Sequence, residues 1–344
     1  MLNVPAFLNT ISTRTFALPV AIFYVTEGCN LQCQTCSYRD RLPGELSLEE
    51  ISSLARGLRE KGLRRIVYSG GEPLFRKDFP EICKIFARER IAQSLLTNGL
   101  LLNRRYGEIK EFLSEIIVSV DGVDSATHNH IRGVDSLETI TAGIHRVLAD
   151  SKRPIVSVRT VLQKCNFRQL PAFVEFAKSL QIDSISFLAV DVLSASFGRS
   201  RRGSVAPDVS LLLNAEETAE FRQLVLHVIA EYKGEFEHHL IAESPVKLLH
   251  IVQYFEALSG RTTFPPNRCN APMVSAVITS TGNIQPCFFL PPHGNIRETP
   301  LPELFNSTSL RSTRDAVREG TLERCKTCVC TMYKHPVKAL MDKF

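Results

Sequence analysis

The stretch FALPVAIFYVTEGCNLQCQTCSY, residues 16–38, joins an apolar run to three closely spaced cysteines. The run at 19–26 has the composition of a buried β-strand. Directly after it, Cys29, Cys33 and Cys36 form a C-x3-C-x2-C pattern. Three thiols are one fewer than a structural zinc or a closed iron–sulfur cluster requires. A four-iron cluster held by three thiolates keeps one iron open, so the pattern predicts a metal site that can bind a further ligand.

Apolar runs and helix-like segments alternate through the first half of the chain. This alternation predicts an α/β fold with a parallel sheet and right-handed crossovers, either doubly wound or curved into a barrel. In both cases the loops at the carboxyl ends of the strands carry the chemistry. Ser47 and Glu50 form a capping box at the first helix, and Asn166 is expected to cap the fifth. The expected strands are 19–26, 65–69, 93–97, 115–120, 154–162 and 183–190, and the expected helices are 47–60, 78–90, 103–113, 135–150 and 167–180.

Composition narrows the class of protein. With 344 residues, 44% of them hydrophobic and 22% charged, the chain can form one large domain and a smaller one. Its longest apolar run, about ten residues, is too short to span a bilayer, and the N-terminus lacks the charged region of a signal peptide, so we expect a cytoplasmic protein with no membrane span. The net charge of +5 permits an anionic ligand but does not predict a nucleic-acid partner. In a reducing compartment the ten cysteines indicate metal ligands or catalytic groups rather than disulfides.

The cysteine pattern and its place after the first strand resemble the radical S-adenosylmethionine (radical SAM) superfamily over residues 17–190. The resemblance implies a partial (β/α)6 TIM-like barrel. It also implies that Cys29, Cys33 and Cys36 bind a 4Fe–4S cluster whose open iron binds S-adenosylmethionine (SAM). An electron from a reductant such as flavodoxin or ferredoxin then cleaves SAM to methionine and a 5′-deoxyadenosyl radical, which abstracts a hydrogen atom from an unactivated C–H bond. A zinc knuckle is the alternative interpretation of the three cysteines.

A motif after the second expected strand agrees with this resemblance. In SGGEP, residues 69–73, adjacent glycines allow the backbone to approach a ligand closely, and Glu72 can accept a hydrogen bond from an ammonium group. In the resembled family this GGE motif binds the methionine amino group of SAM. The resemblance therefore implies that Gly70, Gly71 and Glu72 bind SAM, whereas an ordinary Gly-Pro turn is the alternative.

Three further residues are assigned to SAM by the same resemblance. Ser119 matches a position that contacts SAM, and Arg159 is expected to pair with the SAM carboxylate as a bidentate donor. Val190 lies where some relatives place an apolar contact to adenine. The alternatives are a plain strand end for Ser119 and a surface charge for Arg159. The residues expected to shape the same face are Thr97 to Gly99, Asp121, His128 and Arg132.

A second group of thiols lies near the C-terminus. Cys269 and Cys287 belong to a C-x12-G-x4-C pattern, in which two apolar runs joined by Thr281-Gly282-Asn283 predict a β-hairpin. The pattern resembles the auxiliary-cluster extension of the superfamily, called SPASM in its long form and twitch in its short form. Five cysteines are too few for the two clusters of the long form, so one auxiliary 4Fe–4S cluster is expected. The ligands are to be chosen from Cys269, Cys287, Cys325, Cys328 and Cys330; the choice among the last three stays open, and a structural zinc is the alternative.

Four segments are expected. Residues 1–16 form an N-terminal extension, 17–193 the radical SAM core, 194–260 a linker loop and helices, and 261–344 the SPASM or twitch-like domain. Ser, Gly and Arg residues in 194–213 predict a boundary loop or lid, followed by a helix over about 214–233.

The substrate is the least defined part of the prediction. No peptide-binding winged domain is evident before residue 19, so a small or medium-sized metabolite is expected, with an oxidoreductase-like reaction. A SPASM-type maturase of ribosomal peptides is the alternative within the same class. An iron–sulfur electron carrier explains the cysteines but not SGGEP, and a zinc-stabilised binding module predicts no SAM binding. Phe23 and Tyr24 are expected in the core.

Overall fold

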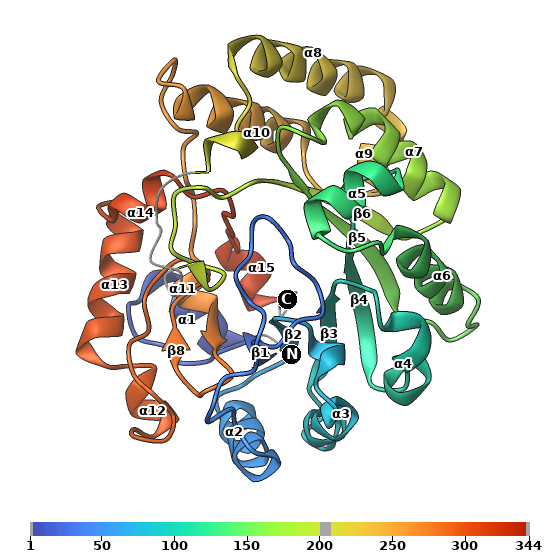
Figure 1. Cartoon of the computed structure of the whole chain (residues 1–344). Coiled ribbons are helices and arrows are strands. Elements are labelled where there is room, and N and C mark those ends of the chain that lie inside the picture. Colours follow the sequence, from blue (N-terminus) through green and yellow to red (C-terminus); the bar gives the residue numbers. More distant parts are fainter. Residues whose placement is uncertain (1–2, 200–207, 342–344) are drawn as a thin grey trace.

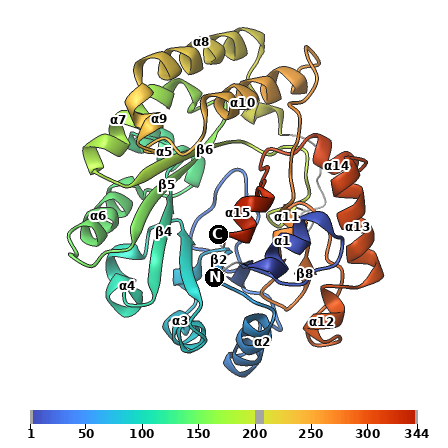
Figure 2. The same cartoon turned by 180° about the vertical axis from the view of Figure 1, so that it is seen from behind.

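The computed structural model describes residues 3–199 and 208–341. Its centre is an eight-stranded sheet with the order β6-β5-β4-β3-β2-β1-β7-β8. β1 to β6 run parallel and curve into a partial barrel with helices outside it, as Figure 1 and Figure 2 show from opposite sides, which confirms the predicted fold class. The strands are β1 (Val20–Thr26), β2 (Arg65–Gly70), β3 (Ala92–Thr97), β4 (Leu113–Ser119), β5 (Ile155–Leu162) and β6 (Ser184–Ala189), and the helices that follow the first five are α2 (Leu48–Glu60), α3 (Phe79–Arg88), α4 (Leu102–Ile109), α6 (Leu137–Leu148) and α7 (Leu170–Leu180).

Local sequence signals start these elements. Ser47 Oγ accepts a hydrogen bond from the Glu50 amide at 3.3 Å, and the Glu50 carboxylate accepts one from the Ser47 amide at 2.8 Å. The predicted capping box of α2 is therefore confirmed. Asn166 does not cap a helix, because its amide nitrogen donates to Asp121 O at 3.0 Å and to Val161 O at 2.9 Å. Its prediction as a cap was wrong: Asn166 instead ties the ends of β4 and β5 together.

The C-terminal hairpin belongs to the same sheet as the barrel. β7 (Ser275–Ile278) pairs in parallel with β1, with Ser275 opposite Val20, and β8 (Ile284–Gln285) pairs antiparallel with β7. The turn needs glycine, because Gly282 has φ +87° and a Cβ there would lie 2.9 Å from Ile296. The hairpin was predicted, whereas its parallel pairing with the first barrel strand was not.

The N-terminal segment is fastened to the C-terminal region. Its helix α1 (Val4–Ile11) carries the buried Asn9, whose side-chain amide donates to Met273 O at 2.9 Å and also to Ala17 O, while its oxygen accepts from the Phe16 amide at 2.7 Å. The remaining helices are α5 (Ser125–Arg132), α8 (Ala215–Glu231), α9 (Lys233–Glu237), α10 (Pro245–Leu258), α11 (Ala271–Val274), α12 (Leu301–Leu304), α13 (Thr308–Glu319), α14 (Glu323–Lys326) and α15 (Pro336–Leu340).

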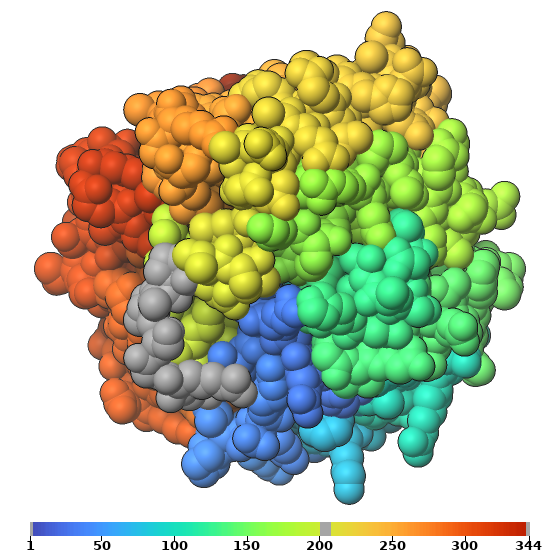
Figure 3. Space-filling model, turned by 45° about the horizontal axis from the view of Figure 1, so that its top comes forward, coloured from blue at the N-terminus to red at the C-terminus, as the bar shows by residue number. Residues whose placement is uncertain are grey.

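Several connections lie over the carboxyl ends of the barrel strands. Figure 3 shows blue N-terminal residues in the middle of one face, with teal and green residues of the barrel on one side and yellow residues on the other. Of the expected boundary loop, 194–199 and 208–213 are described and 200–207 lie outside the described residues. The four-segment division stays a prediction. Within the described ranges, no helix has the length and apolar character of a membrane span.

Candidate active site

The first three cysteines lie in the loop that follows β1, here called the cluster loop (27–38). Backbone hydrogen bonds hold this loop against two neighbouring elements. The Gln32 amide donates to Arg132 O at 3.1 Å and the Gln34 amide to Ile131 O at 3.0 Å, so the end of α5 supports one side. The Glu72 amide donates to Gly28 O at 2.9 Å, which fixes the loop to the SGGEP turn. The loop is thus positioned by the backbone on both sides.

Each of the three thiols accepts a hydrogen bond from a different donor. The Asn98 side-chain amide lies 3.8 Å from Cys29 Sγ, the Arg132 guanidinium 3.9 Å from Cys33 Sγ, and the Tyr38 amide 3.5 Å from Cys36 Sγ. Burial raises the pKa of Cys29 to about 12 in the metal-free protein, so bound iron must supply the positive charge that deprotonates it. Donors aimed at the sulfurs favour thiolates, so the residues present fit the predicted cluster.

Arg132 and its neighbours form a buried charged group beside the cluster loop. Arg132 pairs with Asp121 at 2.7 Å, and its Nε is buried with no hydrogen-bond partner among the described residues. His128 Nδ1 accepts from the Asp121 amide at 3.3 Å, and burial lowers the pKa of His128 to about 3, so the imidazole is neutral. These residues were expected to shape the SAM face. They meet at the cluster loop, and a role towards SAM stays a prediction.

The two glycines of SGGEP allow the turn to touch the cluster loop. Gly70 has φ +114°, and a Cβ built there would lie 2.3 Å from Thr26 O. A Cβ on Gly71 would lie 2.2 Å from Gly28 O and 2.7 Å from Glu27 O. The close approach seen in the structure is therefore to the backbone that carries Cys29.

Glu72 is completely buried and already accepts three hydrogen bonds. Its Oε1 accepts from the Leu74 amide at 2.9 Å and from Thr97 Oγ1 at 2.8 Å, and its Oε2 accepts from the Asn98 amide at 2.7 Å. Burial raises its pKa to about 7, in spite of these donors. Glu72 thus links the ends of β2 and β3, and its bond to the SAM ammonium stays a prediction for its remaining lone pair.

The other three residues assigned to SAM lie on β4 and β5 and just after β6. Ser119 and Arg159 are opposite each other in the β4–β5 register. Arg159 Nε donates to Ser186 Oγ on β6 at 3.1 Å, so Arg159 is bound to the sheet rather than free on the surface. Val190 is fully buried in the core directly after β6. Their contacts with SAM stay predictions.

The second group of thiols surrounds one cavity. It has a volume of about 90 Å³, and all five C-terminal cysteines line it. Burial raises the pKa of Cys287 to about 12. Among the described residues, no three His, Cys, Asp or Glu side chains converge on a point as they would around a single metal ion. Because each thiolate of a 4Fe–4S cluster binds a different iron, a shared cavity is the arrangement that such a cluster requires.

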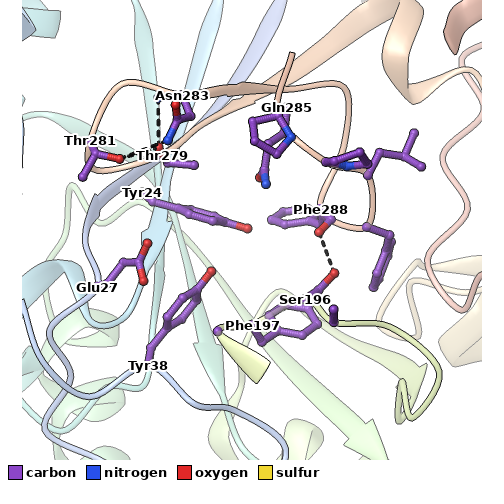
Figure 4. Close-up of a pocket in the computed structure, with 16 residues that line it drawn as sticks. Tyr24, Glu27, Tyr38, Ser196, Phe197, Thr279, Thr281, Asn283, Gln285 and Phe288 are labelled. Atoms are coloured by element: carbon purple, nitrogen blue, oxygen red, sulfur yellow. Dashed lines mark hydrogen bonds between the residues drawn. The ribbon is translucent and has the colours of Figure 1, made fainter. Parts of the chain in front are cut away.

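A larger cavity of about 460 Å³ lies between the cluster loop and the hairpin that carries Cys287 (Figure 4). Tyr24 was expected in the core, and it is buried, but its hydroxyl points into this cavity (Figure 4). Its ring stacks on Phe288 with a centroid distance of 6.1 Å and meets Tyr38 edge-on at 6.0 Å. Strand alternation could have identified Tyr24, because it lies two residues before the end of β1 on the face opposite to Phe23. The other polar residues around the cavity are Glu27, Ser196, Thr279, Thr281, Asn283 and Gln285.

Residues 195–198 form one wall of this cavity and contact both thiol-bearing regions. The Ser37 amide donates to Phe197 O at 2.8 Å, on the side of the cluster loop. Ser196 Oγ donates to Phe288 O at 2.8 Å, next to Cys287. The expected boundary segment therefore bridges the two regions over its described part.

Comparisons with known proteins match the two thiol regions separately. Residues 23–177 match the model of the radical SAM superfamily, and residues 269–329 match the model of the SPASM iron–sulfur cluster-binding domain. A probable GTP 3′,8-cyclase of Methanococcus maripaludis is 33% identical over 161 residues, which are 45% of this chain and 54% of that protein. The chain thus spans about half the length of the first curated relatives it matches.

Two other proteins match over nearly the whole chain. The antilisterial bacteriocin subtilosin biosynthesis protein AlbA of Bacillus subtilis is 26% identical over 333 residues, covering 94% of this chain and 67% of that protein. The structure of Streptococcus suis SuiB bound to precursor peptide SuiA superposes with a TM-score of 0.66 at 16% identity, covering 93% of this chain and 73% of that one. The two matched domains imply a 4Fe–4S cluster with SAM and an auxiliary iron–sulfur cluster, and the chain belongs to the radical SAM superfamily, with a SPASM domain after its radical SAM domain.

Proposed function

We propose that the enzyme abstracts a hydrogen atom from a substrate bound in the 460 Å³ cavity between the cluster loop and the C-terminal hairpin. The 4Fe–4S cluster and SAM supply the 5′-deoxyadenosyl radical when bound, and Cys29, Cys33 and Cys36 are the proposed cluster ligands. The electron comes from a reductant such as flavodoxin or ferredoxin. The single observation that carries the proposal is the position of this cavity, which borders both thiol-bearing regions.

The cavity has the chemistry of a binding site. Its volume falls within the range of about 300–1,000 Å³ that is usual for small-molecule sites. Phe197, Phe288 and Phe289 supply apolar walls that exclude water, while Asn283 and Gln285 offer amide groups for hydrogen bonds with substrate. Tyr24 adds a hydroxyl that points into the same cavity. The proposed task of these residues is to orient one C–H bond and to keep the radical from solvent.

Two substrate classes fit such a site. A peptide segment is favoured by the match to AlbA over 94% of this chain, and amide and hydroxyl groups in the wall suit a peptide backbone. A small or medium-sized metabolite, the class expected from the sequence, is supported by the cavity volume. We therefore propose a peptide first and a metabolite second.

The test separates these classes by size. A lysate is separated into a peptide fraction and a low-mass fraction. Anaerobically reconstituted enzyme receives SAM, dithionite and one of the two fractions, and substrate-dependent 5′-deoxyadenosine is measured. A rise with the peptide fraction supports a peptide substrate, and a rise only with the low-mass fraction supports a metabolite. The Gln285→Leu variant should lose this rise but keep the slow substrate-free cleavage of SAM. Gln253 lies outside the cavity, so the Gln253→Leu variant should behave as wild type. Equal rises in both variants would contradict the cavity as the substrate site.

A further inference from the structure

Arg324 lies directly before Cys325 and lines the 90 Å³ cavity that the five C-terminal cysteines share. Its Nε is buried and has no hydrogen-bond partner among the described residues. A buried donor without a partner costs free energy, so it points to a ligand that the protein holds in its loaded form. The cavity it lines is the predicted site of the auxiliary cluster, whose sulfur atoms can accept such a bond.

The rest of the Arg324 side chain is held in place by three contacts. One of its terminal nitrogens lies 2.8 Å from Asp191 Oδ1, the other donates a hydrogen bond to Thr327 Oγ1 at 3.2 Å, and its guanidinium lies 5.0 Å from the ring centre of Phe289. Asp191 lies two residues after the end of β6 and also binds Arg199 at 2.5 Å. Because Asp191 belongs to the barrel and Arg324 to the C-terminal region, their bond fixes the guanidinium relative to both.

The charge of this group is well defined. Burial raises the pKa of Asp191, but the hydrogen bond from Ser194 and the guanidiniums of Arg324 and Arg199 outweigh burial and lower this pKa below its usual value. Asp191 is therefore an anion that faces two cations.

We propose that Arg324 donates its Nε–H to a sulfur atom of the auxiliary cluster and thereby raises the reduction potential of that cluster. Hydrogen bonds to the sulfurs and nearby charge are main determinants of iron–sulfur potentials. Reduction adds negative charge to the cluster, so a cation that donates to it stabilises the reduced form more than the oxidised form. The proposal depends on the auxiliary cluster and not on the identity of the substrate.

The experiment is a redox titration of both clusters followed by electron paramagnetic resonance. Arg324→Gln removes the charge but keeps an N–H donor at the ε position, whereas Arg324→Lys keeps the charge and lacks that donor. Arg268→Gln is the matched control, because Arg268 also precedes a cluster-region cysteine but lies on the exposed Tyr333, 3.9 Å from its ring centre, and does not line the cavity. Iron content and substrate-free SAM cleavage are measured on the same samples.

We expect a more negative midpoint potential for the auxiliary cluster in Arg324→Gln, a smaller negative shift in Arg324→Lys, and no shift in Arg268→Gln. The cluster bound by the first three cysteines should keep its potential in all variants. A wild-type midpoint in Arg324→Lys would overturn the hydrogen bond, and this variant decides if Arg324→Gln does not fold. An equal shift in Arg268→Gln, or a reconstituted protein that holds no auxiliary cluster, would also overturn the proposal.

Discussion

Replacing Gly71 with alanine should displace the cluster loop. The added Cβ would lie 2.2 Å from Gly28 O, whereas ordinary contacts begin near 3.4 Å, so one of the two backbones must shift by roughly 1 Å. Gly28 is hydrogen-bonded to the same turn through its carbonyl, and Cys29 follows it, so the shift acts on a thiol ligand. A displacement of 1 Å at a reacting centre costs about a hundredfold in rate. Crowding of this kind destabilises a fold by about 1–3 kcal/mol.

The assay is substrate-free formation of 5′-deoxyadenosine by anaerobically reconstituted enzyme, with iron content measured in parallel. We expect Gly71→Ala to lower the rate by about a hundredfold and to retain less iron. Gly107→Ala is the matched control, because a Cβ in that helical position has its nearest neighbour, an Arg146 nitrogen, at 3.9 Å. It should keep full activity and gain a little stability from helix propensity. Wild-type iron content and rate in Gly71→Ala would refute the argument from close approach.

Three further predictions concern ligands, charge and packing. Replacing Cys29, Cys33 and Cys36 with alanine should abolish SAM cleavage yet leave about four irons per chain at the C-terminal site, so a variant that still forms 5′-deoxyadenosine would disprove the ligand assignment. Burial raises the pKa of Glu72 to about 7, above its unfolded value of 4.5, so the folded metal-free protein holds this proton more tightly than the unfolded chain does. The free energy of unfolding should therefore fall by about 3 kcal/mol as the pH rises from below 4.5 to above 7. Urea denaturation should show that fall in wild type and its absence in Glu72→Gln; parallel pH profiles would contradict it. Arg76 is buried and donates to two backbone carbonyls at 2.6 and 2.8 Å, so Arg76→Met should lower the free energy of unfolding by about 3 kcal/mol. A loss below about 1 kcal/mol in urea denaturation would count against a stabilising role of these two hydrogen bonds.

The barrel could be predicted from the sequence because its signals are local. Apolar runs, capping residues and the cysteine spacing each depend on a few neighbouring positions, and all six barrel strands occur close to their expected ranges. Asn166 illustrates the limit of such reasoning. It has the residue type of a helix cap, but carbonyls of Asp121 and Val161 compete for its side chain, and only the folded chain brings them close.

The site was less accessible to sequence reasoning for the same reason. The motifs indicated the cluster loop and the SGGEP turn, and the structure brings them into contact. The cavity as a whole could not be found in this way, because Tyr24, Ser196 and Gln285 come from three distant segments that only the folded chain brings together. Arg324 was also missed, since its importance depends on the pairing with Asp191.

The parallel pairing of β7 with β1 has a consequence for how the polypeptide folds during its synthesis. β1 lies between β2 and β7, so its second edge stays open until residues 275–278 leave the ribosome. An apolar strand with an open edge invites pairing with other chains. A truncated chain that ends before residue 275 would thus expose the unpaired edge of β1, the strand that leads into its first three cysteines. Expression of the barrel without its C-terminal region should for this reason give aggregates rather than a smaller working enzyme.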